Sequence, residues 1–403
     1  MNDIAILTIV AFIFFASRGI TGPVSSLYTE SLGANYVEIG LLGATFSLTA
    51  VFSNYFCGRM LDRANRRKNL LLLGLAAMSI NHWLTALIPS YEYRFPLSIL
   101  ESITQAAYST SSLTLMGDLL EKRDESRGRR MGTYRGLGSL GFGIAAFMSG
   151  TVADLLSIRA TFILAAIFMA VAFFLSLSIR ESQTTNHPIS TIKTQKTQNK
   201  PHVQMSKTVP VSKLKRQKPL APLLVSTFLW FLVIGAVYSV WANYMVSEIG
   251  YDQAEMSRLW AIASLSELPF MILAGWLSDR LGRLSFMSLG LLTWAFVFLG
   301  YVLVPMKPWI ILIQLCRGFA YSAFISTSMT YAAEARLKAQ RGRVAGLYNS
   351  LGSIGSMLGS LVGGGLSQFT NFQIMITVNA AIIFIGAMYV AFTAIKAGKM
   401  RGI

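Results

Sequence analysis

Long hydrophobic segments alternate with short polar segments along almost the entire chain. A helix that crosses a bilayer needs about 20 mostly apolar residues, and the pattern predicts twelve such spans. The first one lacks the basic flank and the small-residue cleavage site of a signal peptide, so we interpret it as a retained helix. The pattern therefore predicts an all-α membrane protein with twelve transmembrane helices. The predicted spans cover residues 4–29, 36–60, 69–89, 95–120, 131–153, 160–180, 220–246, 256–278, 284–304, 309–333, 344–367 and 373–395.

One polar stretch is much longer than the others. Residues 181–219 are rich in Thr, Ser, Lys, Gln and Pro and contain no aromatic residue. A segment of this composition cannot bury a hydrophobic core, so it predicts a disordered cytoplasmic linker. The linker divides the chain into an N-terminal six-helix bundle, residues 1–180, and a C-terminal six-helix bundle, residues 220–403.

The two halves repeat each other in sequence. A shift of 217 residues places the segment Gly58–Arg63 on Gly275–Arg280, and a shift of 214 places residues 128–141 on residues 342–355. Repeats in the same orientation predict two bundles related by a pseudo-two-fold axis along the membrane normal. In such an arrangement the solute site lies between the bundles, near the middle of the membrane.

Composition and charge placement exclude a soluble protein. Only 13% of the residues are charged and 53% are hydrophobic, whereas soluble domains have about 25% charged residues. Of the 35 Lys and Arg residues, 29 fall in one alternating set of loops and tails, two fall inside spans, and four fall in the other loops: Arg94, Arg159, Arg258 and Lys307. By the positive-inside rule, the basic loops and both termini are cytoplasmic. Because topology accounts for the net charge of +17, we expect no nucleic-acid partner.

The sequence predicts no cofactor and no metal site. Cys57 and Cys316 both lie in apolar spans, without the spacing of a disulfide framework or a zinc site. A single GxGxxG at Gly136–Gly141 lies inside a span and follows no strand, so it does not indicate dinucleotide binding. The chain has no Walker A pattern. We therefore expect a protein that is not an enzyme, and we expect any coupling to come from an ion gradient.

A loop motif occurs twice, once in each half. Residues 275–283 read Gly-Trp-Leu-Ser-Asp-Arg-Leu-Gly-Arg, and residues 58–66 repeat this with Met60 and Asn65 as departures. The motif resembles the signature Gly-x-Leu-x-Asp-Arg-x-Gly-Arg, which the major facilitator superfamily carries between its second and third helices and echoes between its eighth and ninth. The resemblance extends over nearly the whole chain apart from the linker. It implies a plasma-membrane carrier, normally a monomer, in which two bundles rock around one central site.

The resemblance also implies a latch on the cytoplasmic side, which holds that gate shut when the carrier faces outward. Asp62 would face the start of a helix at residues 343–346, and Arg66 would pair with Asp118. The alternative is that the motif serves topology and helix packing alone. The candidate gate residues are Gly58, Asp62, Arg63, Arg66, Asp118, Gly275, Asp279, Arg280, Arg283, Glu334 and Arg343.

Four ionisable residues lie well inside predicted spans: Arg18, Glu101, Glu267 and Arg317. Such residues are costly in a membrane and are functional candidates by default. Each half carries one acid and one base, so we expect two ion pairs, Arg18 with Glu101 and Glu267 with Arg317. By the resemblance, the first, fourth, seventh and tenth helices line the solute cavity, and their polar and aromatic stripes add further candidates. The candidate solute-binding residues are Arg18, Glu101, Gln105, Tyr108, Tyr238, Trp241, Gln314, Arg317 and Tyr321.

The expected ion pairs support two interpretations. In the first, Glu101 or Glu267 takes up a proton, and a solute that draws the arginine away raises the affinity of the acid for that proton. Glu267 is favoured in this role because it lies near Pro269 and the Gly275 gate. In the second interpretation, the pairs are structural and hold helices together.

Several other polar residues receive a simpler interpretation. His82 is the histidine that lies inside a predicted span, and we interpret it as a packing residue. Glu30, Glu38 and Asp154 lie near the predicted outer surface, and we expect them to be solvated.

The favoured function is secondary active transport by alternating access, coupled to protons. The expected solute is small and polar or weakly anionic, such as a sugar or a carboxylate. The alternative is efflux of amphipathic drugs, although the glycine-rich fifth helix lacks the Gly-Pro pair of the family's drug-exporting branch. A third interpretation is a non-transporting receptor built on a carrier scaffold.

Overall fold

The computed structural model describes residues 3–64, 67–121, 127–179, 219–334 and 341–399, and these residues are almost entirely helical. The predicted linker, residues 181–219, lies almost wholly outside them. The helices of the first half are α1 (Asp3–Thr21), α2 (Ser25–Ser31), α3 (Tyr36–Ala64), α4 (Arg67–Leu87), the 3-10 helix η1 (Tyr91–Tyr93), α5 (Arg94–Glu121), α6 (Arg127–Leu155) and α7 (Ile158–Leu177). Those of the second half are α8 (Ala221–Asn243), the π-helix η3 (Tyr244–Glu248), α9 (Gln253–Leu281), α10 (Arg283–Leu303), α11 (Trp309–Glu334), α12 (Arg341–Phe369) and α13 (Phe372–Lys399).

Twelve spans account for these elements, so the predicted fold class is confirmed. The first predicted span is broken: α1 ends at Thr21 and α2 begins at Ser25, with Pro23 between them. A proline disfavours helical geometry in the preceding residue and has no backbone N–H to donate, so the helix stops there. The seventh span continues from α8 into η3.

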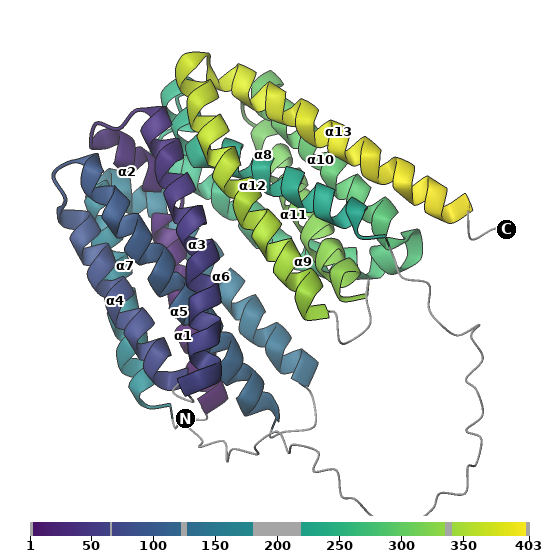
Figure 1. The fold of residues 1–403 in the computed structure, drawn as a ribbon. Helices are drawn as coiled ribbons and strands as arrows, with labels where there is room; N and C mark the ends of the chain where they lie inside the picture. The colour runs from purple at the N-terminus through teal and green to yellow at the C-terminus, as the bar shows by residue number, and fades with distance from the viewer. Residues whose placement is uncertain (1–2, 65–66, 122–126, 180–218, 335–340, 400–403) are drawn as a thin grey trace, which may run out of the picture.

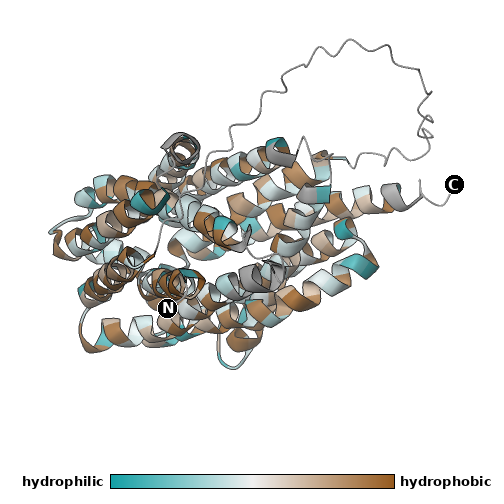
Figure 2. Cartoon of the chain, turned by 90° about the horizontal axis from the view of Figure 1, so that it is seen from below, coloured by the Kyte–Doolittle hydropathy of each residue, from teal (hydrophilic) through white to brown (hydrophobic). Residues whose placement is uncertain are grey.

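Ten of the helices are both long and apolar enough to cross a membrane by composition alone, counted over the residues that the structure describes. Helices α5 and α12 complete the twelve spans. Their 28 and 29 residues suffice in length, but α5 is rich in Ser and Thr and α12 in Gly and Ser. Hydrophobic residues recur along the helices throughout the array (Figure 2).

The two halves form two bundles that lean together at one end (Figure 1). Helices α1 to α7 make one bundle and α8 to α13 the other, and the bundles touch mainly where α3 packs on α12 and α6 packs on α9. The bundles meet at the top of Figure 1 and diverge toward the bottom, where the N-terminus lies.

Glycines show how the distance between the bundles changes along these two helix pairs. At the end that carries the connection between α2 and α3, called here the closed end, a Cβ on Gly150 would overlap the backbone of Gln253, and one on Gly364 would overlap Tyr36. At the opposite end, called here the open end, a Cβ on Gly58 or Gly275 would have no neighbour within 4 Å. The helices are therefore in backbone contact at the closed end and separated at the open end.

Two side-chain caps join the bundles at the closed end. Asp154, near the end of α6, accepts a hydrogen bond from the backbone N–H of Ala254 at the start of α9 over 2.9 Å. Gln368, near the end of α12, accepts one from the N–H of Tyr36 at the start of α3 over 3.0 Å. The shift of 214 residues that relates the two halves maps Asp154 onto Gln368. Each half therefore caps a free helix start of the other half, at equivalent places.

Asp154 is exposed and Glu30 and Glu38 are partly exposed, in line with the expected solvation, but two of these acids also join the bundles. Asp154 caps a helix, and Glu30 accepts hydrogen bonds from the side chain of Asn243 in the opposite bundle, over 2.6 Å, and from the hydroxyl of Tyr36, over 3.0 Å. In the connections at this end, a hydrogen bond to Glu38 raises the pKa of the Tyr91 hydroxyl to about 12.

The double variant Asp154→Ala, Gln368→Ala removes both inter-bundle caps. We expect it to shift the conformational equilibrium toward the state in which the two bundles have separated at the closed end. A helix cap stabilises by about 0.5–2 kcal/mol, so the loss of two shifts the closed-to-separated ratio at least about fivefold. Spin labels at exposed Leu156 and Met306, in opposite bundles, should then report a longer distance.

The matched control is Asn371→Ala. Asn371 caps the first turn of α13 within its own bundle, where its Oδ1 accepts from the N–H of Ile374 over 2.7 Å. This variant should leave the label distance unchanged. If it lengthens the distance as much as the double variant does, the caps do not hold the closed end.

Candidate functional site

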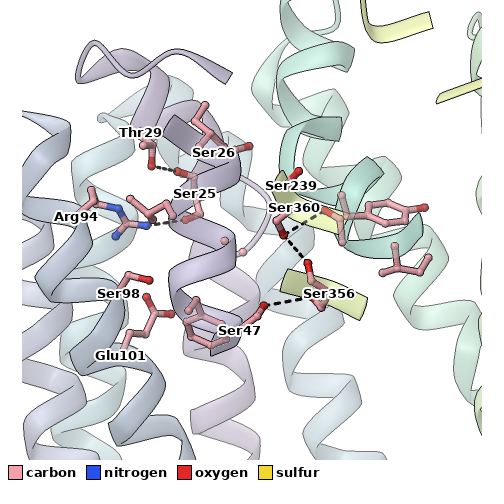
Figure 3. Close-up of a pocket in the computed structure, with 18 of the residues that line it drawn as sticks. Ser25, Ser26, Thr29, Ser47, Arg94, Ser98, Glu101, Ser239, Ser356 and Ser360 are labelled. Atoms are coloured by element: carbon pink, nitrogen blue, oxygen red, sulfur yellow. Dashed lines mark hydrogen bonds between the residues drawn. The ribbon is translucent and has the colours of Figure 1, made fainter. Parts of the chain in front are cut away.

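A cavity of about 350 Å³ lies between the two bundles, beneath the closed end. This size falls within the range of about 300–1,000 Å³ that is usual for small-molecule sites. The first bundle contributes α1, α2, α3 and α5 to its wall, and the second contributes α8, α9 and α12 (Figure 3). A solute in the cavity would therefore touch both halves of the protein.

An ion pair stands in the wall formed by the first bundle. The guanidinium of Arg18 on α1 bonds the carboxylate of Glu101 on α5, and both residues line the cavity. Their side chains are 27% and 14% exposed. The pair predicted from sequence is confirmed, and it leaves this part of the cavity without net charge.

A second arginine in the wall was missed by the sequence analysis. Arg94, assigned there to an outer loop, is the first residue of α5 and is only 3% exposed. Its Nη2 donates to the hydroxyl of Ser25 over 2.9 Å (Figure 3), and its guanidinium lies 5.5 Å from the ring centroid of Phe162. The signal in the sequence was spacing: residues 94, 98 and 101 lie on one face of a helix.

Hydroxyl-bearing residues from both bundles also line the cavity, among apolar and aromatic residues. Ser47 on α3 donates to Ser356 on α12 over 3.3 Å, so the two bundles are hydrogen-bonded at the cavity itself (Figure 3). Hydroxyls of this kind can donate and accept, and so they suit a polar solute. The Ser and Thr residues that line the cavity are Ser25, Ser26, Thr29, Ser47, Ser98, Ser239, Ser356 and Ser360.

An aromatic wall separates the cavity from Arg317. Tyr238 and Trp260 line the cavity, and the guanidinium carbon of Arg317 lies 4.6 Å and 4.9 Å from the centroids of their rings. Arg317 is 7% exposed and also donates to Gln314 over 3.3 Å.

The expected ion pair between Glu267 and Arg317 does not form. Both residues belong to the described chain. The ion pairs of that chain, defined by an N···O distance of up to 4.0 Å, do not include one between Arg317 and Glu267. The physical reason is competition, because aromatic faces attract a desolvated guanidinium and three of them surround Arg317, including Trp241 at 6.0 Å. Glu267 is half-buried on α9, where its backbone carbonyl accepts from Ser322 over 2.9 Å.

Other predicted site residues lie in the bundles rather than in the cavity wall. Tyr108 stacks on Phe14 with centroids 3.6 Å apart, and Tyr321 packs on Trp230 at 5.8 Å. Helical spacing placed these residues on the right helices but could not tell which neighbouring helix covers them. The predicted residues outside the wall in this conformation are Gln105, Tyr108, Trp241, Gln314, Arg317 and Tyr321. His82 is 1% exposed, with its ring 6.4 Å from that of Phe162.

The candidate gate residues that the structure describes with their side chains lie at the open end. In the second bundle, Arg283 bonds Asp279 over 2.5 Å and Glu334 over 3.2 Å, which ties α9, α10 and α11 together. Arg280 lies over the ring of Trp276 at 3.8 Å. In the first bundle, the described partner of Asp118 is Arg67.

Most side chains of the predicted latch lie outside the part of the chain that the structure describes. Arg66 and the side chains of Asp62 and Arg63 lie outside the described residues. Arg343, near the start of α12, is exposed, and a Cβ on Gly346 would meet nothing within 4 Å. The start of α12 is therefore not covered by a described part of the first bundle.

Comparison with known proteins identifies the fold and the family. The family model described as "MFS_1 like family" matches residues 4–377. A maltose permease of Geobacillus stearothermophilus is 25% identical over 359 residues, which are 89% of this chain and 86% of that protein. The multidrug resistance protein MdtG of Enterobacter lignolyticus is 23% identical over 98% of this chain and 93% of its own.

Solved structures agree on the fold. The nucleoside transporter NupG superposes with a TM-score of 0.77 at 16% identity, covering 97% of this chain and 98% of its own. A bacterial homolog of the human lysosomal transporter Spinster, in an inward-facing and unoccupied conformation, gives 0.76 at 15% identity, covering 97% and 96%. At these identities the likeness extends to the fold alone.

Proposed function

Because this chain belongs to the major facilitator superfamily, and is a membrane transporter rather than an enzyme, we propose that it carries a small polar or weakly anionic solute by proton-coupled alternating access. One observation carries the proposal. The cavity between the bundles is lined by hydroxyls from both halves and by an ion pair, and it lies beneath a closed end and above an open one. We further propose a monomer in the plasma membrane, with both termini in the cytoplasm.

The asymmetry of the two ends supports alternating access. The closed end is held by two side-chain caps, by glycine contacts of α3 with α12 and of α6 with α9, and by apolar residues of the first bundle, such as Val24 and Ile39, that share a buried cluster with the second bundle. The open end lacks such contacts between the described glycines Gly58 and Gly275 and the opposite bundle, so the cavity is closed on one side only. Described basic residues that flank the basic loops, among them Arg67, Arg280 and Arg283, lie at the open end, and by the positive-inside rule that end faces the cytoplasm. The structure then corresponds to an inward-facing state.

The lining of the cavity supports a small polar solute over a drug. The related proteins carry names that range from maltose permease to multidrug resistance protein, so relatedness alone leaves the solute open. A buried hydroxyl or charge that is left without a partner is costly, so a wall with eight Ser and Thr residues selects against an apolar solute.

Glu267 is the better candidate for the proton-carrying acid. Protonating it breaks no ion pair in this conformation, whereas protonating Glu101 would break its bond to Arg18. Glu267 lies two residues before Pro269, which donates no backbone hydrogen bond within α9. The aromatic wall that holds Arg317 borders the cavity and keeps its guanidinium from pairing with Glu267, so a solute that packs against this wall would favour the state in which Glu267 carries a proton.

A panel of solutes added to the purified protein tests this function. The panel contains sugars, carboxylates, nucleosides and cationic drugs, and unfolding is followed by heating at two pH values. A ligand at 100 times its Kd stabilises the folded state by about 2.7 kcal/mol. We expect stabilisation by small polar solutes, stronger at the lower pH. Stabilisation by amphipathic cations alone would contradict the proposal.

The second candidate function is efflux of amphipathic compounds. Phe46, Tyr238 and Trp260 give the cavity an aromatic surface on which a drug could stack. Overexpression would then confer resistance to dyes or drugs, and Asp62→Asn would abolish that resistance. A third candidate, a non-transporting receptor, would require that no solute crosses the membrane and that Asp62 is dispensable.

A further inference from the structure

Arg94 carries a buried positive charge that has no ion-pair partner among the described residues. It is 3% exposed, and within the described chain its guanidinium is in no ion pair. Its Nε has no hydrogen-bond partner. Arg94 contacts a serine hydroxyl and an aromatic face, and such groups compensate a desolvated charge only in part.

The described acids of the first bundle near the cavity and the closed end are engaged elsewhere. Glu101, two helical turns along α5, bonds Arg18. Glu30 accepts from Asn243 and Tyr36, Glu38 from Tyr91, and Glu92 from Ser90. The cavity wall therefore contains two arginines and one glutamate, and its uncompensated charge is that of Arg94.

The geometry points to Arg94 as the binding residue for the carboxylate of the solute, and we propose that the solute is a hydroxylated monocarboxylate. This inference rests on the proposed transport function and names its substrate class. One guanidinium matches one carboxylate in charge and in fork geometry. Ser98, one turn along the same face of α5, and Ser26 on α2 make no hydrogen bond to a described residue, so both hydroxyls are free to bond the same end of the solute.

The opposite wall suits the hydroxyl groups of such a solute. Ser239 and Ser360 on the second bundle each donate to a backbone carbonyl of their own helix, over 2.9 Å and 3.0 Å. Their oxygen lone pairs therefore face the cavity as acceptors for a hydroxyl donor. The two walls of the cavity therefore differ: the first bundle offers an anion site and the second offers hydrogen-bond acceptors. One solute bound to both walls would link the two bundles.

The test compares D-gluconate with D-glucitol, which has a similar hydroxylated chain without the carboxylate. Binding is measured by calorimetry on the full-length purified protein. A hydrogen bond to a charged group contributes about 1.5–3 kcal/mol, so gluconate should bind at least about tenfold more tightly than glucitol. Arg94→Gln should remove this preference by weakening gluconate alone. Hexanoate, which has the carboxylate but no hydroxyls, should bind more weakly than gluconate.

The matched control is Arg159→Gln, which removes an exposed arginine at the same end of the same bundle, outside the cavity wall. It should retain the preference for gluconate. If Arg94→Gln does not fold, the comparison of the two ligands on the wild-type protein decides. The inference is overturned if glucitol binds as tightly as gluconate, if Arg94→Gln weakens both ligands equally or neither, or if no hydroxylated monocarboxylate binds. Gradient-driven uptake of another solute would then still support the proposed transport function.

Discussion

Glu101→Ala is expected to destabilise the protein by about 1.5–3 kcal/mol, which is the usual contribution of a hydrogen bond to a charged group, because the Arg18–Glu101 pair is partly buried in the cavity wall. Arg18 would remain in the cavity wall with a charge that no described acid pairs with. The measurement is the melting temperature of the purified variant. The same variant should also lose binding of the solute, because the charge of the cavity changes by one unit.

The matched control is Glu255→Gln, which breaks the ion pair with Lys307 at the closed end. Those side chains are 32% and 55% exposed, and a surface pair contributes only about 0–1 kcal/mol. Equal losses of melting temperature in Glu101→Ala and Glu255→Gln would contradict the larger contribution expected of the partly buried Arg18–Glu101 pair.

A double variant separates stability from function at this pair. Arg18→Met with Glu101→Leu replaces two charges by apolar side chains of similar size, which is often neutral or stabilising. We expect its melting temperature to return to the wild-type value while transport stays lost. Transport at the wild-type rate would mean that the pair serves structure alone.

Glu267→Gln is expected to abolish accumulation of the solute while leaving exchange of solute across the membrane intact. Glutamine keeps the shape and polarity of the side chain but cannot gain or lose a proton, so solute movement is no longer linked to proton movement. With one proton per solute, a gradient of one pH unit, equivalent to about 1.4 kcal/mol, drives about tenfold accumulation. In the variant this ratio should fall to one, as measured in proteoliposomes.

The control for this prediction is again Glu255→Gln, which makes the same substitution near the start of the same helix, α9, at a residue outside the cavity wall. It should accumulate solute as the wild-type protein does. Loss of exchange as well as accumulation in Glu267→Gln would indicate a structural role for Glu267, and unchanged accumulation would exclude it as the proton carrier.

The number of helices and the two halves could be predicted because both depend on features that are local in sequence. Span length and hydropathy define each helix, and the repeated Gly58 and Gly275 segments reveal the duplication. The break at Pro23 was not predicted, because the hydrophobic run continues across it.

The site could be predicted only in part, because burial and partner choice are tertiary. The Arg18–Glu101 pair followed from two charges in helices expected to meet. The prediction of a Glu267–Arg317 pair was wrong, because the sequence does not reveal that the rings of Tyr238 and Trp260 lie against the guanidinium of Arg317. Arg94 was missed because a charge at the start of a helix resembles a loop charge until its burial is known.

The caps at the closed end illustrate the same limit. The shift of 214 residues relates Asp154 to Gln368 in the sequence, but neither residue is unusual on its own. Their role depends on which helix start of the opposite bundle lies within hydrogen-bond reach, and this is visible only in the folded chain.

Uptake by the wild-type protein in proteoliposomes, under an imposed pH gradient, tests the central claim most directly. The solute is the one that stabilises the purified protein most strongly in the panel. The account predicts that this solute accumulates on the alkaline side above its equilibrium concentration, and that accumulation stops when an ionophore collapses the gradient. Equilibration without accumulation, whether or not the gradient is present, would contradict proton-coupled transport.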